Sequence, residues 1–138
     1  MDDVVALHKE VFGTALELQV YEDGLIFQRV DERLVGYVLF QVVDDFADLH
    51  YIVVAPEFRR LGYGFELMEL FLKDVGGRGV KGITLEVRSD NVAAVGLYEA
   101  FAFECIHVRK GYYKDGCDGL LMRLELDGGC LSEIAHLV

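Results

Sequence analysis

The sequence predicts a single α/β domain built on a mixed sheet. Residues 25–54 contain strand-like runs that are separated by short acidic turns. Over residues 61–75 the apolar residues recur every three or four positions, and after residue 83 strand-like runs alternate with a second helical segment. Antiparallel strands followed by strand–helix–strand units are typical of an α/β fold.

The length of the chain supports one domain. A chain of 138 residues suits one hydrophobic core, and this chain has a single Pro, no Pro/Ser-rich linker and no internal repeat. We therefore place the domain at residues 1–126 and a C-terminal tail at residues 127–138. Three apolar residues of this tail suggest a short terminal helix: Leu131, Ile134 and Leu137.

The first half is predicted to fold as a helix followed by an antiparallel meander. Asp2–Phe12 has the apolar spacing of an amphipathic helix that ends near Gly13, and a further helical turn is expected within Thr14–Val20. Acidic pairs at 31–32 and 44–45 supply turns between the strands that follow. These strands are Leu25–Val30, Arg33–Val43 and Leu49–Val54.

The second half is predicted to alternate helices with strands. One helix has the glycines at 62 and 64 at its start and stops at Gly76-Gly77, which suits a C-cap. Its buried face is expected to hold Leu61, Phe65, Met68, Phe71, Leu72 and Val75. Ser89-Asp90-Asn91 supplies the chemistry of an N-cap for the next helix. The remaining elements are the strand Ile83–Val87, a helix from Val92 to about Phe101, and the strands Phe103–Val108 and Leu120–Leu126.

Charge and hydropathy narrow the class of partner. The net charge of −11 disfavours binding to nucleic-acid phosphates and favours cationic partners such as amines, although surplus acid also keeps a protein soluble. The acidic start Met1-Asp2-Asp3 does not resemble a secretory signal, and no apolar run approaches the ~20 residues that span a bilayer. We therefore expect a cytoplasmic protein, monomeric or homodimeric, with no membrane or nucleic-acid partner.

The cysteines and histidines indicate no metal site. Three widely spaced cysteines form neither a Cys-x-x-Cys pair nor a disulfide framework, and Cys105 lies in an apolar run that predicts a core position. The four histidines are scattered along the chain and make no ligand pattern. Structural roles are expected for them.

A glycine-bearing helix start predicts a phosphate site. Arg59 and Arg60 precede Gly62 and Gly64, between a strand and the helix predicted to begin there. The first N–H groups of a helix have no partner inside it and bind anions, and glycine lets a phosphate approach the backbone closely. The spacing excludes a P-loop, and Leu67 stands where a dinucleotide fingerprint needs its third glycine. Close packing of the helix on the sheet is the alternative reason for these glycines.

A second motif narrows this prediction to one family. Downstream of the phosphate segment lie Leu85-Glu86-Val87-Arg88, then Asn91, then Leu97-Tyr98-Glu99, then Val108-Arg109-Lys110-Gly111-Tyr112-Tyr113. Over roughly residues 33–126 the chain resembles the GNAT N-acetyltransferase superfamily, and within it the RimI-like branch of ribosomal-protein alanine N-acetyltransferases. The resemblance implies a mixed sheet with two splayed central parallel strands, flanking helices, and acetyl-CoA as the acetyl donor.

The resemblance also implies how acetyl-CoA is bound. The pantetheine arm would pair with the backbone of one strand and would bond Asn91. The pyrophosphate would be wrapped by the helix start and its arginines. The implied donor-binding residues are Ile52, Val53, Val54, Arg59, Arg60, Leu61, Gly62, Tyr63, Gly64 and Phe65.

The family mechanism is direct attack of an amine on the thioester. Glu86 would be the general base, and a carboxylate in an otherwise apolar strand is costly to bury unless it is paired or used. The alternatives for Glu86 are a salt bridge to Arg88 or a solvated face. Tyr98 would protonate the leaving thiolate, with a role as a core aromatic as the alternative, and the Val54 N–H could meet the oxyanion.

The acceptor side departs from the family pattern. Tyr112 and Tyr113 resemble the paired tyrosines that close the acceptor site, and they would equally suit an aromatic cross-strand pair in a hairpin. Family members usually begin with a strand, so here either the first strand is missing or the tail or a partner chain covers the sheet edge. The chain has no Trp in the acceptor loop or elsewhere, and Ala102 stands where a Gly is usual.

The function expected from the sequence is acetyl transfer from acetyl-CoA to a primary amine. The acceptor is either a protein N-terminus or a small molecule. A non-catalytic acyl-CoA-binding module is the alternative from another class, and an enzyme that uses a nucleotide in the same loop is a third.

Overall fold

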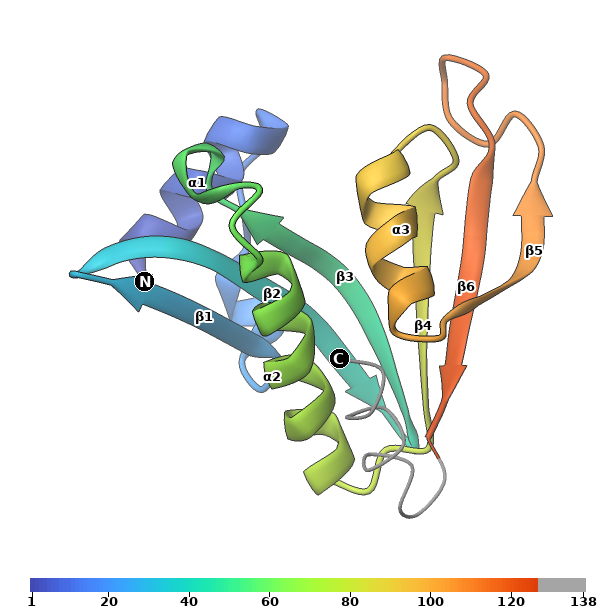
Figure 1. Cartoon of the computed structure of the whole chain (residues 1–138), viewed down its shortest axis with the longest axis horizontal. Coiled ribbons are helices and arrows are strands. Elements are labelled where there is room, and N and C mark those ends of the chain that lie inside the picture. Colours follow the sequence, from blue (N-terminus) through green and yellow to red (C-terminus); the bar gives the residue numbers. More distant parts are fainter. Residues whose placement is uncertain (127–138) are drawn as a thin grey trace. The chain divides into compact units, whose positions relative to one another are not determined.

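A computed structural model describes residues 1–126 of the chain, so the predicted tail helix lies outside the described residues. The helices are α1 (Asp2–Phe12), α2 (Tyr63–Gly77) and α3 (Val92–Ala100), with short 3-10 turns at Leu18–Tyr21 and Pro56–Phe58. The strands are β1 (Leu25–Val30), β2 (Arg33–Val43), β3 (Phe46–Val54), β4 (Gly82–Arg88), β5 (Glu104–Arg109) and β6 (Gly119–Glu125). The predicted α/β class and element order are confirmed (Figure 1).

The strands form one mixed six-stranded sheet in the order β1-β2-β3-β4-β6-β5. β3 and β4 are parallel, with residue pairs from Phe46/Gly82 to Leu49/Leu85. β1 with β2, β4 with β6 and β5 with β6 are antiparallel. The described residues divide into two compact units: residues 1–41 with 50–72, and residues 42–49 with 73–126.

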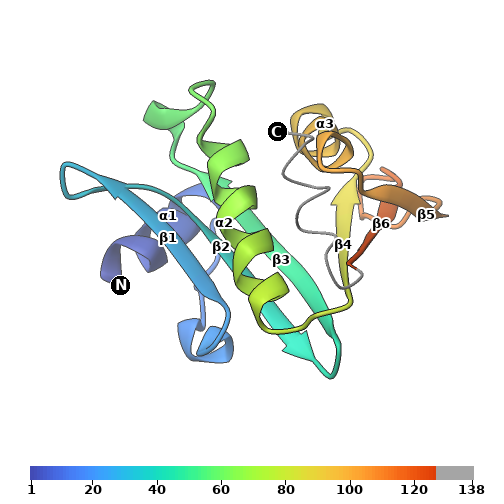
Figure 2. The ribbon, with the colours of Figure 1, turned by 60° about the horizontal axis from the view of Figure 1, so that its bottom comes forward.

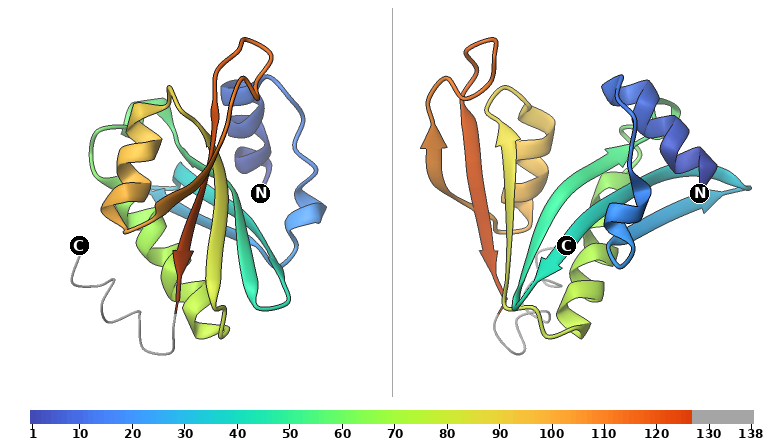
Figure 3. Two further views of the ribbon diagram at one scale, coloured as in Figure 1. Left: turned by 90° about the vertical axis from the view of Figure 1, so that its right-hand side faces the viewer. Right: turned by 180° about the vertical axis from the view of Figure 1, so that it is seen from behind.

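In the first unit, α1 and α2 cover opposite faces of the strands (Figures 1 and 3). Val4 and Leu7 of α1 belong to a core cluster with Tyr37 and Leu39 of β2. Alternation along β2 turns Phe40 to the other face, where its ring meets Phe71 of α2 at 4.9 Å. The apolar faces of α1 and α2 therefore cover the two faces of the sheet in this unit.

In the second unit, α3 packs beside β4, as the views in Figures 2 and 3 agree. Alternate residues Ile83, Leu85 and Val87 of β4 are buried, which puts Thr84, Glu86 and Arg88 on its other face. All six residues of β5 are exposed, and the pairing of β5 with β6 is irregular between Cys105 and His107. The prediction that Cys105 is a core residue is therefore wrong, because β5 is a solvent-exposed strand.

Helix α2 differs from its predicted bounds at both ends. Leu61 precedes the helix and is 66% exposed, so it is not part of the buried face. The helix reaches Gly77, and the left-handed residue that ends it is Gly79, at φ 77°. Val80 N–H donates to Val75 O and Gly79 N–H donates to Gly76 O, the two bonds of a Schellman motif.

Helix α3 ends in the same motif, with Ala102 in place of the glycine. Phe103 N–H donates to Tyr98 O, Ala102 N–H donates to Glu99 O, and Ala102 has φ 69°. The left-handed conformation costs a residue with a Cβ about 1 kcal/mol or more. The motif is nevertheless complete, since the Phe103 and Tyr98 rings supply its apolar contact at 5.8 Å.

Replacing Ala102 with Gly is expected to raise the free energy of unfolding by about 1 kcal/mol, because the left-handed strain is removed. Chemical denaturation of wild type and variant measures the change. The matched control is Gly79→Ala, which places a Cβ at φ 77° with open space around it and should cost a similar amount. Equal stability of wild type and Ala102→Gly would contradict the strain.

A buried histidine connects α1 with β2. His8 is 2% exposed, and its Nδ1 lies 2.8 Å from the hydroxyl of the fully buried Tyr37. Its ring also packs edge-on against Tyr51 at 4.8 Å. Burial lowers the pKa of His8 below its usual 6.5, so the folded protein holds this imidazole neutral at neutral pH. The predicted structural role of His8 agrees with this arrangement.

The His8 pKa predicts a pH dependence of stability. Below pH 6.5 the unfolded chain protonates His8, whereas the folded protein protonates it only at a lower pH. The contribution of neutral His8 to the free energy of unfolding is therefore complete above the unfolded pKa. It is lost as the pH falls from that value toward the pKa of His8 in the folded protein. Urea unfolding between pH 7.5 and 5.5 should show wild type losing stability faster than His8→Phe. The control is His107→Gln on exposed β5, which should retain the wild-type slope. Parallel curves for wild type and His8→Phe would contradict the assignment.

Candidate active site

The predicted phosphate segment connects β3 with α2 in the first unit. After the turn at Pro56–Phe58, Arg60 and Gly62 are left-handed, at φ 64° and 87°, and α2 begins at Tyr63. Glu66 N–H donates to Gly62 O, so the helical hydrogen bonds begin there. The N–H groups of Tyr63 and Gly64 come before that bond, at positions where a helix has no internal acceptor to offer.

Gly62 has a conformational reason to be glycine and no packing reason. A Cβ built on it would meet no heavy atom within 4 Å, whereas its φ of 87° disfavours any larger residue. The alternative that Gly62 permits close helix packing is therefore wrong for this residue. Open space above left-handed backbone at a helix start suits an approaching phosphate.

Arg59 shapes this segment from within. Its Nε donates to the carbonyl oxygen of Val54 at 3.0 Å, which closes the loop onto the end of β3. The guanidinium retains its charge beside the helix start. Arg59 thus combines a bond that holds the loop with the cationic character expected of a phosphate neighbour.

The predicted pantetheine strand is the last part of β3. Val53 is buried in the core of the first unit, whereas Ile52 and Val54 are partly exposed. The residue pairs of β3 with β4 run to Leu49/Leu85, and residues 50–72 belong to the first unit. The Ile52–Val54 backbone thus lies beyond the last of these residue pairs.

Glu86 is accessible on β4 and paired. Its side chain is 36% exposed, and Oε1 lies 3.4 Å from a terminal nitrogen of Arg109 on β5. The alternative of a salt bridge between Glu86 and Arg88 is wrong, because Arg88 pairs with Asp90 and Asp115. The argument from burial cost also fails, since Glu86 is on the exposed face of its strand. Glu86 is instead a solvent-accessible carboxylate that is paired with Arg109.

Asn91 is the N-cap of α3. Its Oδ1 accepts a hydrogen bond from Ala94 N–H at 3.2 Å, as the sequence predicted. An amide carries two N–H donors in addition to its oxygen. The cap therefore fixes the orientation of Asn91 while those donors can serve a ligand.

Tyr98 is buried on α3. Burial raises the pKa of Tyr98 to about 12, so its phenol is protonated throughout the neutral range. The Schellman motif at the end of α3 holds Tyr98 through both its carbonyl and its ring. Tyr98 is consequently both a core aromatic and a protonated hydroxyl in a fixed position.

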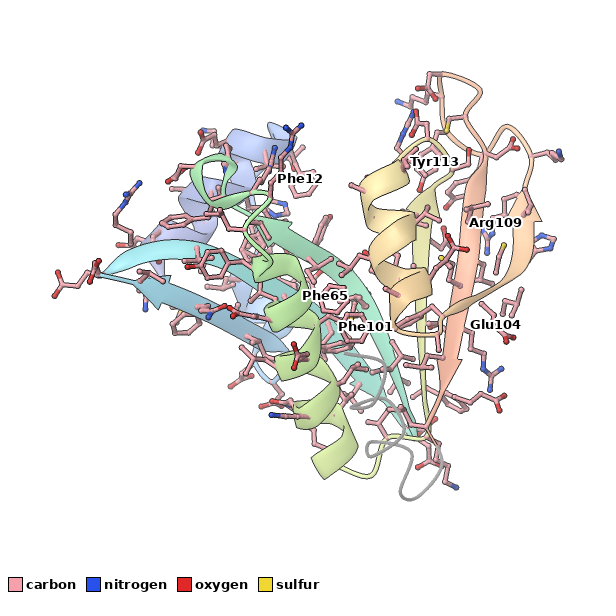
Figure 4. All side chains as sticks on the ribbon, in the orientation of Figure 1. Phe12, Phe65, Phe101, Glu104, Arg109 and Tyr113 are labelled. Atoms are coloured by element: carbon pink, nitrogen blue, oxygen red, sulfur yellow. The ribbon has the colours of Figure 1, made fainter. Side chains whose placement is uncertain are left out.

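The paired tyrosines lie in the loop between β5 and β6, so they are not a cross-strand pair in a hairpin. Their rings meet edge-on at 5.1 Å. Arg109 lies over the Tyr112 ring, 5.1 Å from its centre. Burial raises the pKa of Tyr113, and the charge of Glu86 raises it further. Figure 4 labels Arg109 on β5 and Tyr113 in this loop. The second unit thus brings Glu86, Arg109 and both tyrosines into one cluster.

The predicted residues form two groups, one in each compact unit. The first unit holds the phosphate segment and the end of β3, and the second holds Glu86, Asn91, Tyr98, Tyr112 and Tyr113. The pairing of Arg109 with Glu86 was not predicted, because α3 and most of β5 lie between these two residues in the chain. No local signal marks this pair, because it follows from the register of β4 and β5 on β6.

The chain is an α/β domain in which one unit carries a helix start that follows the left-handed Arg60 and Gly62, and the other carries an accessible strand carboxylate, Glu86, beside two tyrosines. Residues 6–103 match the acetyltransferase (GNAT) family. The chain belongs to this family, as the sequence resemblance predicted.

Individual relatives agree with this membership. The chain is 41% identical over 83 residues to a ribosomal protein bS18-alanine N-acetyltransferase of Salmonella typhimurium, covering 60% of this chain and 56% of that protein. The crystal structure of the ribosomal-protein-S18-alanine N-acetyltransferase from Escherichia coli matches with a TM-score of 0.77 at 30% identity, over 91% of this chain and 88% of that one. A Bacillus subtilis acetyltransferase in complex with CoA shares the fold, with a TM-score of 0.79 at 15% identity, over 92% and 93%.

Two features are absent from residues 1–126. None of the helices in this range has the length and apolar character needed to cross a membrane. The same range contains no group of three His, Cys, Asp or Glu side chains arranged to hold a metal ion.

Proposed function

We propose that the chain transfers the acetyl group of acetyl-CoA to a primary amine, with a protein N-terminus as the acceptor. The observation that carries this proposal is the cluster on β4 and the β5–β6 loop. There an accessible carboxylate, Glu86, lies beside two tyrosine rings in a chain of the GNAT family. A base next to aromatic side chains suits an amine at the end of a peptide.

The donor would be held by the first unit. Open space over Gly62, the first N–H groups of α2 and the charges of Arg59 and Arg60 fit a pyrophosphate. The thioester supplies an activated acetyl group when acetyl-CoA is bound. The backbone of Ile52–Val54 offers hydrogen-bonding groups to an extended arm, with the Val54 N–H directed to the acetyl oxygen.

Glu86 would take the proton of the attacking amine. An α-amino group has a pKa of about 8, so most of it is protonated at neutral pH and a base must help remove a proton. Glu86 lies 3.4 Å from Arg109 and is accessible to solvent, and a carboxylate can accept that proton. An acceptor ammonium would compete with Arg109 for the carboxylate.

Tyr98 would assist the departing sulfur. A thiol has a pKa of about 8.5, so a phenol of pKa about 12 gives a strong hydrogen bond to the thiolate more readily than a complete proton transfer. The buried, fixed position of Tyr98 suits either form of assistance. Its hydroxyl is protonated in the resting protein, as a donor requires.

A protein N-terminus is preferred to a small amine because of the relatives and the charge. The Salmonella and Escherichia coli proteins are named for an alanine N-terminus of a ribosomal protein. A net charge of −11 attracts a basic protein segment. The chain lacks Trp, so contacts to the acceptor differ from those of the family pattern and another basic N-terminus remains open as the substrate.

An acceptor screen tests this function. Release of CoA from acetyl-CoA is followed with peptides that begin with alanine and are rich in basic residues, with N-terminally blocked copies of the same peptides, and with polyamines. Turnover of the free peptides alone supports the proposal. Calorimetry with acetyl-CoA and ATP belongs to the same experiment. Tight binding of acetyl-CoA without turnover would favour a non-catalytic module, and turnover of polyamines alone would favour a small-molecule acceptor.

A further inference from the structure

Arg88 makes the densest set of charged contacts on the second unit. Its Nε and Nη2 donate to the two carboxylate oxygens of Asp90 at 3.1 Å each, and Nη2 also donates to Asp115. Its guanidinium lies 4.8 Å from the ring centre of Tyr113. One side chain at the end of β4 therefore contacts the turn before α3 and the loop that carries the tyrosines.

This loop is defined as residues 110–118, between β5 and β6, and is here called the tyrosine loop. Backbone bonds reinforce the contact with Arg88: Ser89 N–H donates to Asp118 O at 2.9 Å, and Gly111 N–H donates to the Asp118 carboxylate at 2.9 Å. Inside the loop, Tyr113 N–H donates to Cys117 O at 3.1 Å. The loop is thus closed on itself and attached beside Arg88.

The sheet register seats the tyrosines between two arginines. Gly119 of β6 pairs with Arg88 of β4 on one side and with Arg109 of β5 on the other. A Cβ on Gly119 would lie 3.1 Å from the Tyr112 ring, so the missing side chain makes room for that ring. Arg109 contacts Tyr112 and Arg88 contacts Tyr113, which gives each ring its own cation.

We propose that Arg88 is a positioning residue that fastens the tyrosine loop to the turn before α3 and thereby sets the affinity for the acceptor. The inference rests on the proposed function, in which the tyrosines bind the acceptor. Arg88 acts through Tyr113 and Asp115 and touches no reacting atom. It differs from Arg109, which reaches the carboxylate of Glu86 itself.

Arg88 has the chemistry for this role. A guanidinium offers donors in a planar fork that can serve two carboxylates and a ring at once, which a lysine ammonium cannot reproduce. Hydrogen bonds from Arg88 lower the pKa of both Asp90 and Asp115, so the contacts persist at neutral pH. Exposed ion pairs contribute little to global stability, so the effect is expected in the loop and not in the melting temperature.

The experiment compares Arg88→Gln and Asp115→Asn with a matched control, Arg123→Gln. Arg123 has a similar side-chain exposure, 37% against 36%, and it likewise pairs with a carboxylate and lies over an aromatic ring, Phe46. Trypsin cleavage after Lys110 and Lys114, mapped by mass spectrometry, reports the order of the loop. Steady-state kinetics with an acceptor peptide and calorimetry with acetyl-CoA report function.

Arg88→Gln is expected to speed cleavage in the tyrosine loop and to raise the acceptor KM, each by about tenfold, with kcat and the acetyl-CoA Kd near wild type. Asp115→Asn should change the same quantities in the same direction, and it tests the loop contact even if Arg88→Gln folds poorly. Arg123→Gln should change neither. A lysine at position 88 should rescue only part of the loss, because it lacks the fork.

Two results would overturn the inference. Cleavage of the loop at the wild-type rate in both variants would show that Arg88 does not fasten it. Faster cleavage with an unchanged acceptor KM would show that the fastening has no bearing on the acceptor. If the wild-type protein acetylates no peptide, the proposed function fails, and the trypsin comparison still decides whether Arg88 holds the loop.

Discussion

Replacing Glu86 with Gln is expected to lower kcat by about 10²-fold or more, the range for loss of a general base. Glutamine has nearly the same shape and can still accept a hydrogen bond from Arg109, but it cannot take the proton of the amine. Because the change is confined to β4, the Kd for acetyl-CoA should remain near the wild-type value. Steady-state kinetics at pH 7 and calorimetry measure the two quantities.

The control for Glu86 is Glu104→Gln. Glu104 is an exposed carboxylate on β5 of the same sheet, where no role in the reaction is proposed, so kcat should be unaffected. An unchanged kcat for Glu86→Gln would discard Glu86 as the base. A lower kcat accompanied by a much weaker Kd for acetyl-CoA would instead assign Glu86 to the binding of the donor.

Replacing Gly62 with Val is expected to abolish binding of acetyl-CoA. Valine at φ 87° is strained by about 1–2 kcal/mol, and its side chain would occupy the open space over the backbone where the pyrophosphate is proposed to approach. The first effect lowers stability, whereas the second removes binding. Calorimetry with acetyl-CoA and a thermal melt measure them separately.

Gly13→Val separates strain from lost binding. Gly13 ends α1 at φ 73°, and a Cβ on it would also meet no heavy atom within 4 Å. The same substitution there should cost similar stability and leave the acetyl-CoA Kd unchanged. Retained binding in Gly62→Val, or equal loss in both variants, would contradict the assignment of the phosphate site.

The sequence predicted the elements well where local signals agree. The amphipathic period of α1 with Gly13 at its end, and the run from Arg33 to Val43, gave bounds that the structure confirms. The Asn91 cap was predicted for the same reason, since a cap depends on neighbours three residues away. Periodicity and caps are local properties, so one sequence is sufficient to reveal them.

Errors arose where the answer depends on distant parts of the chain. Cys105 was assigned to the core because its strand is apolar, but exposure depends on which strand ends the sheet. Leu61 fits the helical period of α2 although the left-handed Gly62 stops that helix from extending back to it. The local sequence pattern alone therefore cannot reveal that Cys105 is exposed or that Leu61 lies outside α2.

The candidate site shows the same division. The candidate phosphate segment and the Glu86 strand were predicted from contiguous motifs, whereas the ion pairs of the candidate site were not predicted. Arg88 meets Asp115 across 27 residues, and Glu86 meets Arg109 from another strand. Such pairs follow from sheet register, which the sequence specifies only through the finished fold.

The irregular, exposed strand β5 also bears on how the protein behaves at high concentration. In the part of the chain that the structure describes, β5 is the last strand of the sheet, and the outer edge of such a strand can template strand-by-strand association. The break in pairing at Ile106 interrupts the even row of peptide groups along β5, and Glu104 and Arg109 place a charge at each end. The local backbone geometry of this short strand is therefore expected to disfavour such association, independently of the acidic net charge.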